Sequence, residues 1–158
     1  MKSLRCYSIL EVPFDFSYDD LIDAYKNLMT DILNSGKDSN QKNQELNEIM
    51  DIYNILSNEE KRKQYNHIVE LTTLHVYEQM NTVNNKMREI VILCKKKEYK
   101  NISLMTRLSI KKTMKHIVNI LENHEDVANF FEMNYLSCLI ENNDLGKQMN
   151  KIFRSSSL

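Results

Sequence analysis

The near absence of glycine and proline constrains this chain more than any other feature of its sequence. Only 2 Gly and 1 Pro occur among 158 residues. These two residue types usually form tight turns and end helices, so a chain with so few of them favours long helices. The sequence therefore predicts an all-α fold, with a length that suits one domain or two small helical units.

Charge and hydropathy argue against nucleic acid and membranes as binding partners. The formal net charge is -1, with 42% hydrophobic and 27% charged residues. Such a composition is typical of a globular chain, and its charge gives no general attraction to nucleic acid or anionic lipid. No apolar run approaches the roughly 20 residues that cross a bilayer. We expect protein partners, no nucleic acid and no transmembrane segment.

The number and spacing of the cysteines indicate the redox state of the compartment in which the protein works. Cys6, Cys94 and Cys138 are widely spaced and form no CxxC pair, so neither a disulfide framework nor a zinc site is predicted. A reducing compartment is expected, and the sequence leaves both the cytoplasm and the mitochondrion open.

The first sixty-odd residues contain several helical patterns. A short apolar segment ends at Pro13, which cannot continue a helix. A second helix is predicted from Ser17, whose side chain and that of Asp20 have the spacing of a capping box. After a polar loop a third helix follows, and Ser57 with Glu60 predicts a second capping box that begins a short fourth helix.

These patterns together resemble the J-domain of DnaJ-type co-chaperones. The resemblance covers about residues 4–66. It rests on the opening Tyr7-x-x-Leu10-x-Val12, on a tyrosine in the second helix, and on an ending with the order Tyr, Leu, Ser, Lys-Arg, Tyr. It implies an antiparallel hairpin of the second and third helices. The expected core consists of Tyr7, Leu10, Tyr25, Leu28, Ile49, Tyr53 and Leu56.

The resemblance fails where the family carries His-Pro-Asp. Counted from Tyr25, that tripeptide falls at Leu33, Asn34 and Ser35. In the family, the tripeptide and a basic face of the second helix dock on the ATPase domain of a DnaK-type chaperone and trigger hydrolysis. Here one lysine, Lys26, opposes four aspartates in that helix, which weakens or reverses attraction to an acidic surface. The four are Asp19, Asp20, Asp23 and Asp31.

A second unit, residues 67–158, is expected to follow a J-like unit of residues 1–66. Its first helix has apolar residues at heptad spacing, which predicts a coiled-coil-like seam. The seam residues are Val76, Met80, Val83, Met87, Ile90 and Cys94, and a second seam holds Ile110, Met114, Ile117 and Leu121. Two such helices predict an antiparallel hairpin, joined into a bundle by a third helix over residues 125–140.

No catalytic, metal or cofactor site is predicted. The four histidines, His67, His75, His116 and His124, lie too far apart in sequence to form a recognisable ligand pair. The pairs Glu59-Glu60 and Glu125-Asp126 are interpreted as charges at helix N-termini. Gly36 and Gly146 cannot form a phosphate-binding loop. An enzyme is therefore not expected.

These observations favour a non-catalytic scaffold or adaptor, acting as a structural subunit of a larger protein assembly. Its candidate partner surface lies on the third helix of the second unit, at Phe130, Phe131, Tyr135 and Leu136. The pattern leaves open which of Phe130 and Phe131 is buried. The alternative is a co-chaperone or regulator of a DnaK-type chaperone system, of the iron–sulphur-assembly or import-motor type.

Overall fold

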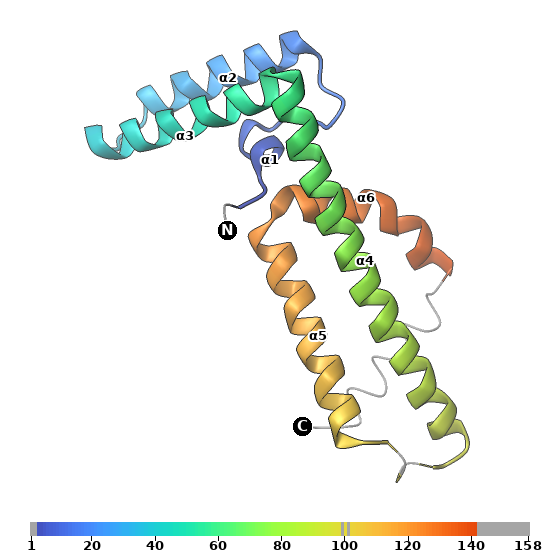
Figure 1. The fold of residues 1–158 in the computed structure, drawn as a ribbon. Coiled ribbons are helices and arrows are strands. Elements are labelled where there is room, and N and C mark those ends of the chain that lie inside the picture. The colour runs from blue at the N-terminus through green and yellow to red at the C-terminus, as the bar shows by residue number, and fades with distance from the viewer. Residues whose placement is uncertain (1–2, 99, 101, 142–158) are drawn as a thin grey trace. The chain divides into compact units, whose positions relative to one another are not determined.

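The computed structural model describes residues 3–98, 100 and 102–141, with side chains as far as residue 133. Within this part the chain forms six α-helices and no strand (Figure 1). The prediction of an all-α fold is confirmed. The helices belong to two compact units. The N-terminal unit extends to Leu71 and includes His124–Asp126, and the C-terminal unit holds the other described residues from Thr72 onwards.

The N-terminal unit contains α1 (Cys6–Leu10), α2 (Tyr18–Leu33), α3 (Ser39–Ser57) and the first turns of α4 (Glu59–Lys95). Figure 1 shows α2 and α3 side by side and antiparallel, and α1 packs against both of them. Burial of apolar side chains between these helices is the main source of their stability. The buried side chains include Tyr7, Leu10, Leu21, Ile49, Ile52 and Leu56.

Local signals set the beginnings of α2 and α3. The predicted capping box of α2 is confirmed, because Asp20 N donates to Ser17 Oγ over 3.1 Å and Ser17 N donates to the Asp20 carboxylate over 3.1 Å. At α3 the Asp38 carboxylate accepts from Gln41 N over 2.9 Å. Each cap satisfies a backbone N–H that the helix itself leaves without an acceptor.

The second predicted capping box is wrong by one residue. Ser57 is the last residue of α3, and the Asn58 side chain accepts from Lys61 N over 2.9 Å at the start of α4. The short helix expected to follow is the beginning of α4, which continues for 37 residues. No proline and no glycine occurs between Gly36 and Gly146, so the sequence contains no strong helix breaker in this region.

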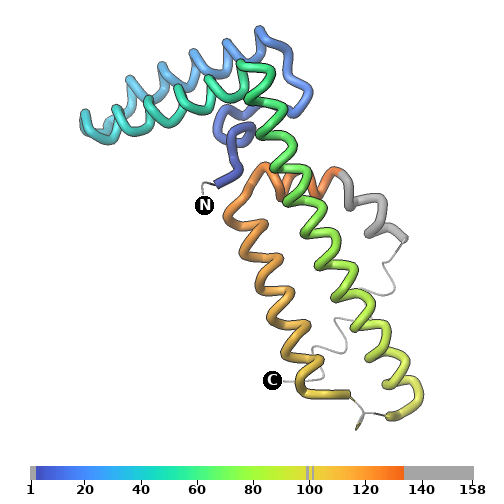
Figure 2. The backbone as a smooth tube through the Cα atoms, viewed as in Figure 1, coloured from blue at the N-terminus to red at the C-terminus, as the bar shows by residue number. Residues whose placement is uncertain are grey.

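The C-terminal unit consists of α4 from Thr72, α5 (Leu104–Asn123) and α6 (Glu125–Glu141) from Val127. Figure 2 shows α4 and α5 running antiparallel, and Lys86 Nζ on α4 donates to Ser109 Oγ on α5 over 2.7 Å. The predicted C-terminal helical arrangement is confirmed. Its core contains Val76, Val83, Met87, Ile90, Ile110, Ile117, Ile120, Val127 and Phe131.

The seam on α5 differs from the predicted one. Met114 is 39% exposed, whereas Ile120 is buried and Leu121 is half-buried. Adjacent helix positions are about 100° apart, so spacing alone does not decide which of two neighbouring apolar residues turns inward. None of the described helices is long and apolar enough to cross a membrane.

Candidate protein-interaction site

The three positions expected to replace His-Pro-Asp lie where α2 ends. Leu33 is the last residue of α2, and its side chain is 53% exposed. Asn34 N donates to Thr30 O over 3.0 Å, which continues the helical hydrogen bonding by one residue. The Ser35 hydroxyl donates to Ile32 O over 2.7 Å. An exposed apolar side chain and two small polar ones therefore occupy this position.

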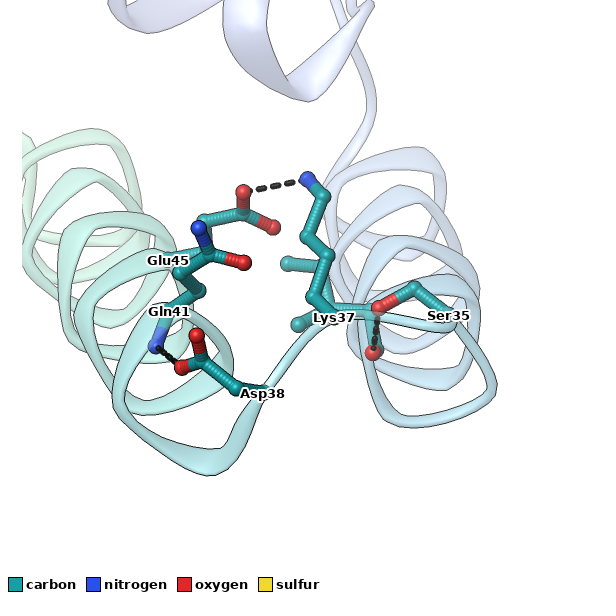
Figure 3. Close-up of polar contacts among 6 residues, drawn as sticks. Ser35, Lys37, Asp38, Gln41 and Glu45 are labelled. Atoms are coloured by element: carbon teal, nitrogen blue, oxygen red, sulfur yellow. Dashed lines mark hydrogen bonds and ion pairs between the residues drawn. The ribbon is translucent and has the colours of Figure 1, made fainter.

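The connection from α2 to α3 is tied to α3 by its own side chains. Figure 3 shows Lys37 directed toward Glu45, with which it forms an ion pair, and Asp38 directed toward the backbone of Gln41. Lys42 Nζ also donates to Leu33 O over 3.0 Å. These contacts join the end of α2 to the first two turns of α3, so the connection has a defined conformation.

The surface of α2 is acidic. Lys26 and the four aspartates of the helix are all exposed: Asp19, Asp20, Asp23 and Asp31. Hydrogen bonds from the side chain and backbone of Ser17 hold the pKa of Asp20 below its ordinary value, which keeps its charge in place. A face with four carboxylates and one ammonium group attracts a basic protein surface and repels an acidic one.

An open cleft lies beside the connection, among α1, α2 and α3. It has a volume of about 530 Å³, and Ser35 and Leu28 are part of its lining. Apolar side chains and charged side chains of both signs also line it. The charged residues are Arg5, Glu11, Asp31, Lys37, Glu45 and Glu48. Arg5 pairs with Glu48 over 2.9 Å. Exposed ion pairs of this kind contribute little to stability, typically less than about 1 kcal/mol.

The residues expected to form the J-domain core differ in burial. Tyr7, Leu10, Ile49 and Leu56 are buried, whereas Tyr25, Leu28 and Tyr53 are half-buried. The rings of Tyr25 and Tyr53 are stacked with their centroids 4.4 Å apart. Aromatic stacking of this kind joins α2 to α3 at the edge of the core.

The expected partner surface on α6 is only partly described. Phe131 is buried, and its ring centroid lies 5.0 Å from that of Tyr77 on α4, so Phe131 belongs to the core of the C-terminal unit. Phe130 is half-buried. The side chains of Tyr135 and Leu136 lie outside the part of the chain whose side chains the structure describes.

One polar cluster was not found from the sequence. The buried Asp126 side chain accepts hydrogen bonds at both oxygens, from Tyr7 N over 3.0 Å, from Ser8 N over 2.9 Å, from Ser8 Oγ over 2.7 Å and from the Tyr65 hydroxyl. Two hydrogen bonds of the Leu4 backbone flank it. Leu4 N donates to His124 Nδ1 over 3.1 Å, and Asp126 N donates to Leu4 O over 2.9 Å. We call these residues the Asp126 network.

Asp126 acts as a distant cap for α1. The residue at the usual capping position, Arg5, makes no side-chain cap hydrogen bond. Asp126 instead accepts from Tyr7 N and Ser8 N. These are the second and third N–H groups of the helix, one of which an N-cap side chain normally satisfies. From the sequence, Glu125 and Asp126 are interpreted as charges at a helix N-terminus. The exposed Glu125 fits this interpretation, whereas the buried Asp126 also caps α1.

Tyr65 completes this network. Its hydroxyl donates to Asp126 and accepts from Cys6 N over 3.0 Å. Burial raises the pKa of Tyr65, and the hydrogen bond to Asp126 raises it further, since both favour the neutral phenol. In the part of the chain that is described, no group of three or more His, Cys, Asp or Glu side chains could hold a metal ion.

Comparison with known proteins identifies one part of the chain. A family model described as the DnaJ domain matches residues 5–66, which is less than half of the chain. Neither the comparison with curated proteins nor that with solved structures found a match.

Proposed function

Residues 5–66 belong to the DnaJ-domain family, and from this premise we propose that the protein is a non-catalytic adaptor that no longer activates the ATPase. A DnaJ domain binds other proteins, with DnaK-type chaperones as the characteristic partners of the family. In this proposal the domain keeps its fold and its protein-binding role, and the chain acts as a structural subunit of a larger protein assembly.

The observation that carries this proposal is the chemistry at the end of α2. Leu33, Asn34 and Ser35 occupy the positions of the family's tripeptide, and none of them supplies an imidazole or a carboxylate. The Ser35 hydroxyl already donates to Ile32 O. A partner that recognises the tripeptide therefore loses the groups that it would bind.

The charge of α2 supports the same proposal independently. Its exposed face carries Lys26 as the one basic residue of the helix among four aspartates. A chaperone surface that attracts a basic helix would experience repulsion here. The exposed Leu33 side chain and the acidic face instead suit a partner whose surface is basic with an apolar patch.

The alternative is a co-chaperone or regulator of a DnaK-type system, and the family match itself favours it. The two functions differ in one measurable property, which is stimulation of ATP hydrolysis by the chaperone. The full chain should be used, because the N-terminal unit includes His124–Asp126.

The test is a single-turnover ATPase assay with a DnaK-type chaperone and a DnaJ protein as the positive standard. We expect no acceleration by the native chain. A variant with Leu33→His, Asn34→Pro and Ser35→Asp, combined with Asp19→Lys and Asp23→Lys, should gain acceleration. The matched control replaces the three tripeptide positions by alanine and keeps both lysines. Acceleration by the native chain equal to that of the standard would establish the alternative.

The graft has a structural cost that must be checked. Asn34→Pro removes the N–H that bonds Thr30 O, and proline disfavours the helical conformation of Leu33. The circular dichroism of the graft should therefore show a slightly shorter α2 and otherwise native helix content. A graft that is folded but inactive would indicate that further residues of the domain have diverged.

We also propose that α6 contributes to partner binding through Phe130. The test compares complexes purified from the native cell with the full chain as bait. Phe130→Ala should release the partner, whereas Glu132→Ala, at an exposed position on the same helix, should retain it. Retention by both variants, together with loss in Leu33→Glu, would assign the partner surface to the N-terminal unit instead.

A further inference from the structure

Two histidines from different helices meet on the C-terminal unit. The Nε2 atoms of His75 on α4 and His116 on α5 lie 3.3 Å apart. Their ring centroids are 5.5 Å apart, and the ring planes are nearly perpendicular at 79°. Both side chains are exposed. Their separation in the sequence gave no indication of this pair.

We propose that His75 and His116 form a binding site for one divalent transition-metal ion of the zinc, nickel and copper class. Imidazole nitrogen is a preferred ligand of these metals, which it binds at about 2.0–2.1 Å. Two such nitrogens on a tetrahedral ion lie about 3.3–3.4 Å apart. The observed distance between the two Nε2 atoms is therefore already that of a chelating pair.

The helices hold this pair in position. His75 precedes the fully buried Val76, and His116 precedes the buried Ile117, so the core of the unit fixes the backbone beside each ligand. The hydrogen bond from Lys86 to Ser109 joins the same two helices further along. Because little rearrangement is needed, the conformational cost of binding is small.

The rest of the coordination shell comes from water. Among the described residues, no third His, Cys, Asp or Glu completes a cluster with these two. Two protein ligands give weaker binding than the four of a structural zinc site, and they leave positions open. A side chain of a partner protein could occupy one of these positions, which would make metal binding and assembly cooperative.

A simpler reading is a hydrogen bond between two neutral imidazoles. That reading requires one Nε2 to carry a hydrogen and the other to carry a lone pair. Metal binding requires lone pairs on both Nε2 atoms, with the hydrogens on Nδ1. The two interpretations therefore differ in whether the histidine pair binds a metal ion.

The experiment is a calorimetric titration of the full chain with ZnCl2, repeated with NiCl2 and with MgCl2 as the negative control. We expect one zinc ion per chain at this site and no magnesium binding. His75→Ala and His116→Ala should each lower the zinc affinity by at least about tenfold, because each removes one of two protein ligands. The matched control is His67→Ala, an exposed histidine on the same helix α4, which should leave the affinity unchanged.

Thermal unfolding gives a second readout. Saturating zinc should raise the unfolding midpoint of the native chain by about 2–4 °C. This rise should disappear in His75→Ala and in His116→Ala and persist in His67→Ala. If zinc does not bind, or if it binds equally well to all three variants, the pair is only a hydrogen bond and the proposal is wrong. The exposed positions make these variants suitable, since each should fold normally.

Discussion

The side chain of Asp126 caps α1 from a distant part of the sequence. Its two oxygens accept hydrogen bonds from the backbone of Tyr7 and Ser8, from the Ser8 hydroxyl and from Tyr65. Tyr7 N and the Tyr65 hydroxyl are buried donors, whereas the two donors of Ser8 are part-buried. Leaving a buried donor unsatisfied costs about 1–3 kcal/mol.

We therefore expect Asp126→Ala to lower the free energy of unfolding by about 3 kcal/mol or more. The measurement is the urea midpoint of the full chain, followed by circular dichroism. Glu125→Ala is the matched control, because Glu125 is the exposed neighbour in the same helical turn. Its effect should remain within about 0.5 kcal/mol. Equal effects of the two substitutions would contradict the capping role of Asp126.

We expect Tyr65 to make the free energy of unfolding fall as the pH becomes alkaline. Its pKa is raised in the folded chain, whereas a tyrosine in the unfolded chain releases its proton near pH 10. Unfolding above about pH 10 therefore releases a proton, so the stabilisation is complete below that pH and is lost as the pH rises. Burial also raises the pKa of Tyr7, which adds a decline of the same sign.

The expected result is that Tyr65→Phe is less stable than the native chain at pH 7 and declines less steeply above about pH 10. Unfolding by urea at a series of pH values measures both effects. Tyr25→Phe, at a half-buried tyrosine of α2 outside the Asp126 network, serves as the control. Parallel pH profiles for the native chain and Tyr65→Phe would show that this tyrosine does not cause the alkaline decline.

At the scale of the helices, a leucine of α3 and a leucine of α2 are expected to contribute differently to the free energy of unfolding. Leu56 is fully buried, whereas Leu28 is half-buried at the cleft. Leu56→Ala should cost about 2–5 kcal/mol, as for other fully buried leucines. Leu28→Ala should cost less, because solvent reaches part of the side chain in the folded state. Met50→Ala, at a 45% exposed position of α3, is the control for both. Similar urea midpoints for Leu56→Ala and Met50→Ala would contradict this assignment of the core.

Local signals in the sequence predicted the helices well. The Ser17 capping box was found because both of its members lie within one turn, and the helical class followed from the scarcity of Gly and Pro. The start of α4 was misplaced by one residue because Ser57 and Asn58 are both good capping residues. Its length was underestimated because the family resemblance ends at residue 66, whereas the helix continues to Lys95.

Long-range polar contacts could not be predicted in this way. Asp126 and the N–H groups of α1 that donate to it lie 118 or more positions apart in the sequence. An Asp in the first turn of a helix is already explained by the helix dipole. The pair His75 and His116 is also long-range, since its members lie 41 positions apart in the sequence. Nothing in the spacing of either set marks it, because only the folded chain brings the members together.

For the whole molecule, the N-terminal unit is not contained in a single stretch of sequence. A fragment ending at residue 71 retains all of α1, α2 and α3 but lacks Asp126. We expect this fragment to be less stable than the same unit in the full chain, by an amount similar to the effect of Asp126→Ala. Hydrogen exchange at the amides of Tyr7 and Ser8 measures this directly, and the full-length Asp126→Ala variant is the reference. Native protection of these amides in the fragment would contradict the prediction.

The distance between α1 and its cap also affects how the protein is made. Ribosomes add about 5–20 residues per second, and 118 positions separate Ser8 from Asp126. The first helix is therefore synthesised roughly 6–24 s before the carboxylate that caps it. During this interval α1 lacks its acceptor, and its apolar side chains remain available to other nascent chains and to cellular chaperones. Synonymous codons that slow translation between α1 and α6 would lengthen this exposure, and the yield of folded protein would fall while the amino-acid sequence stayed the same.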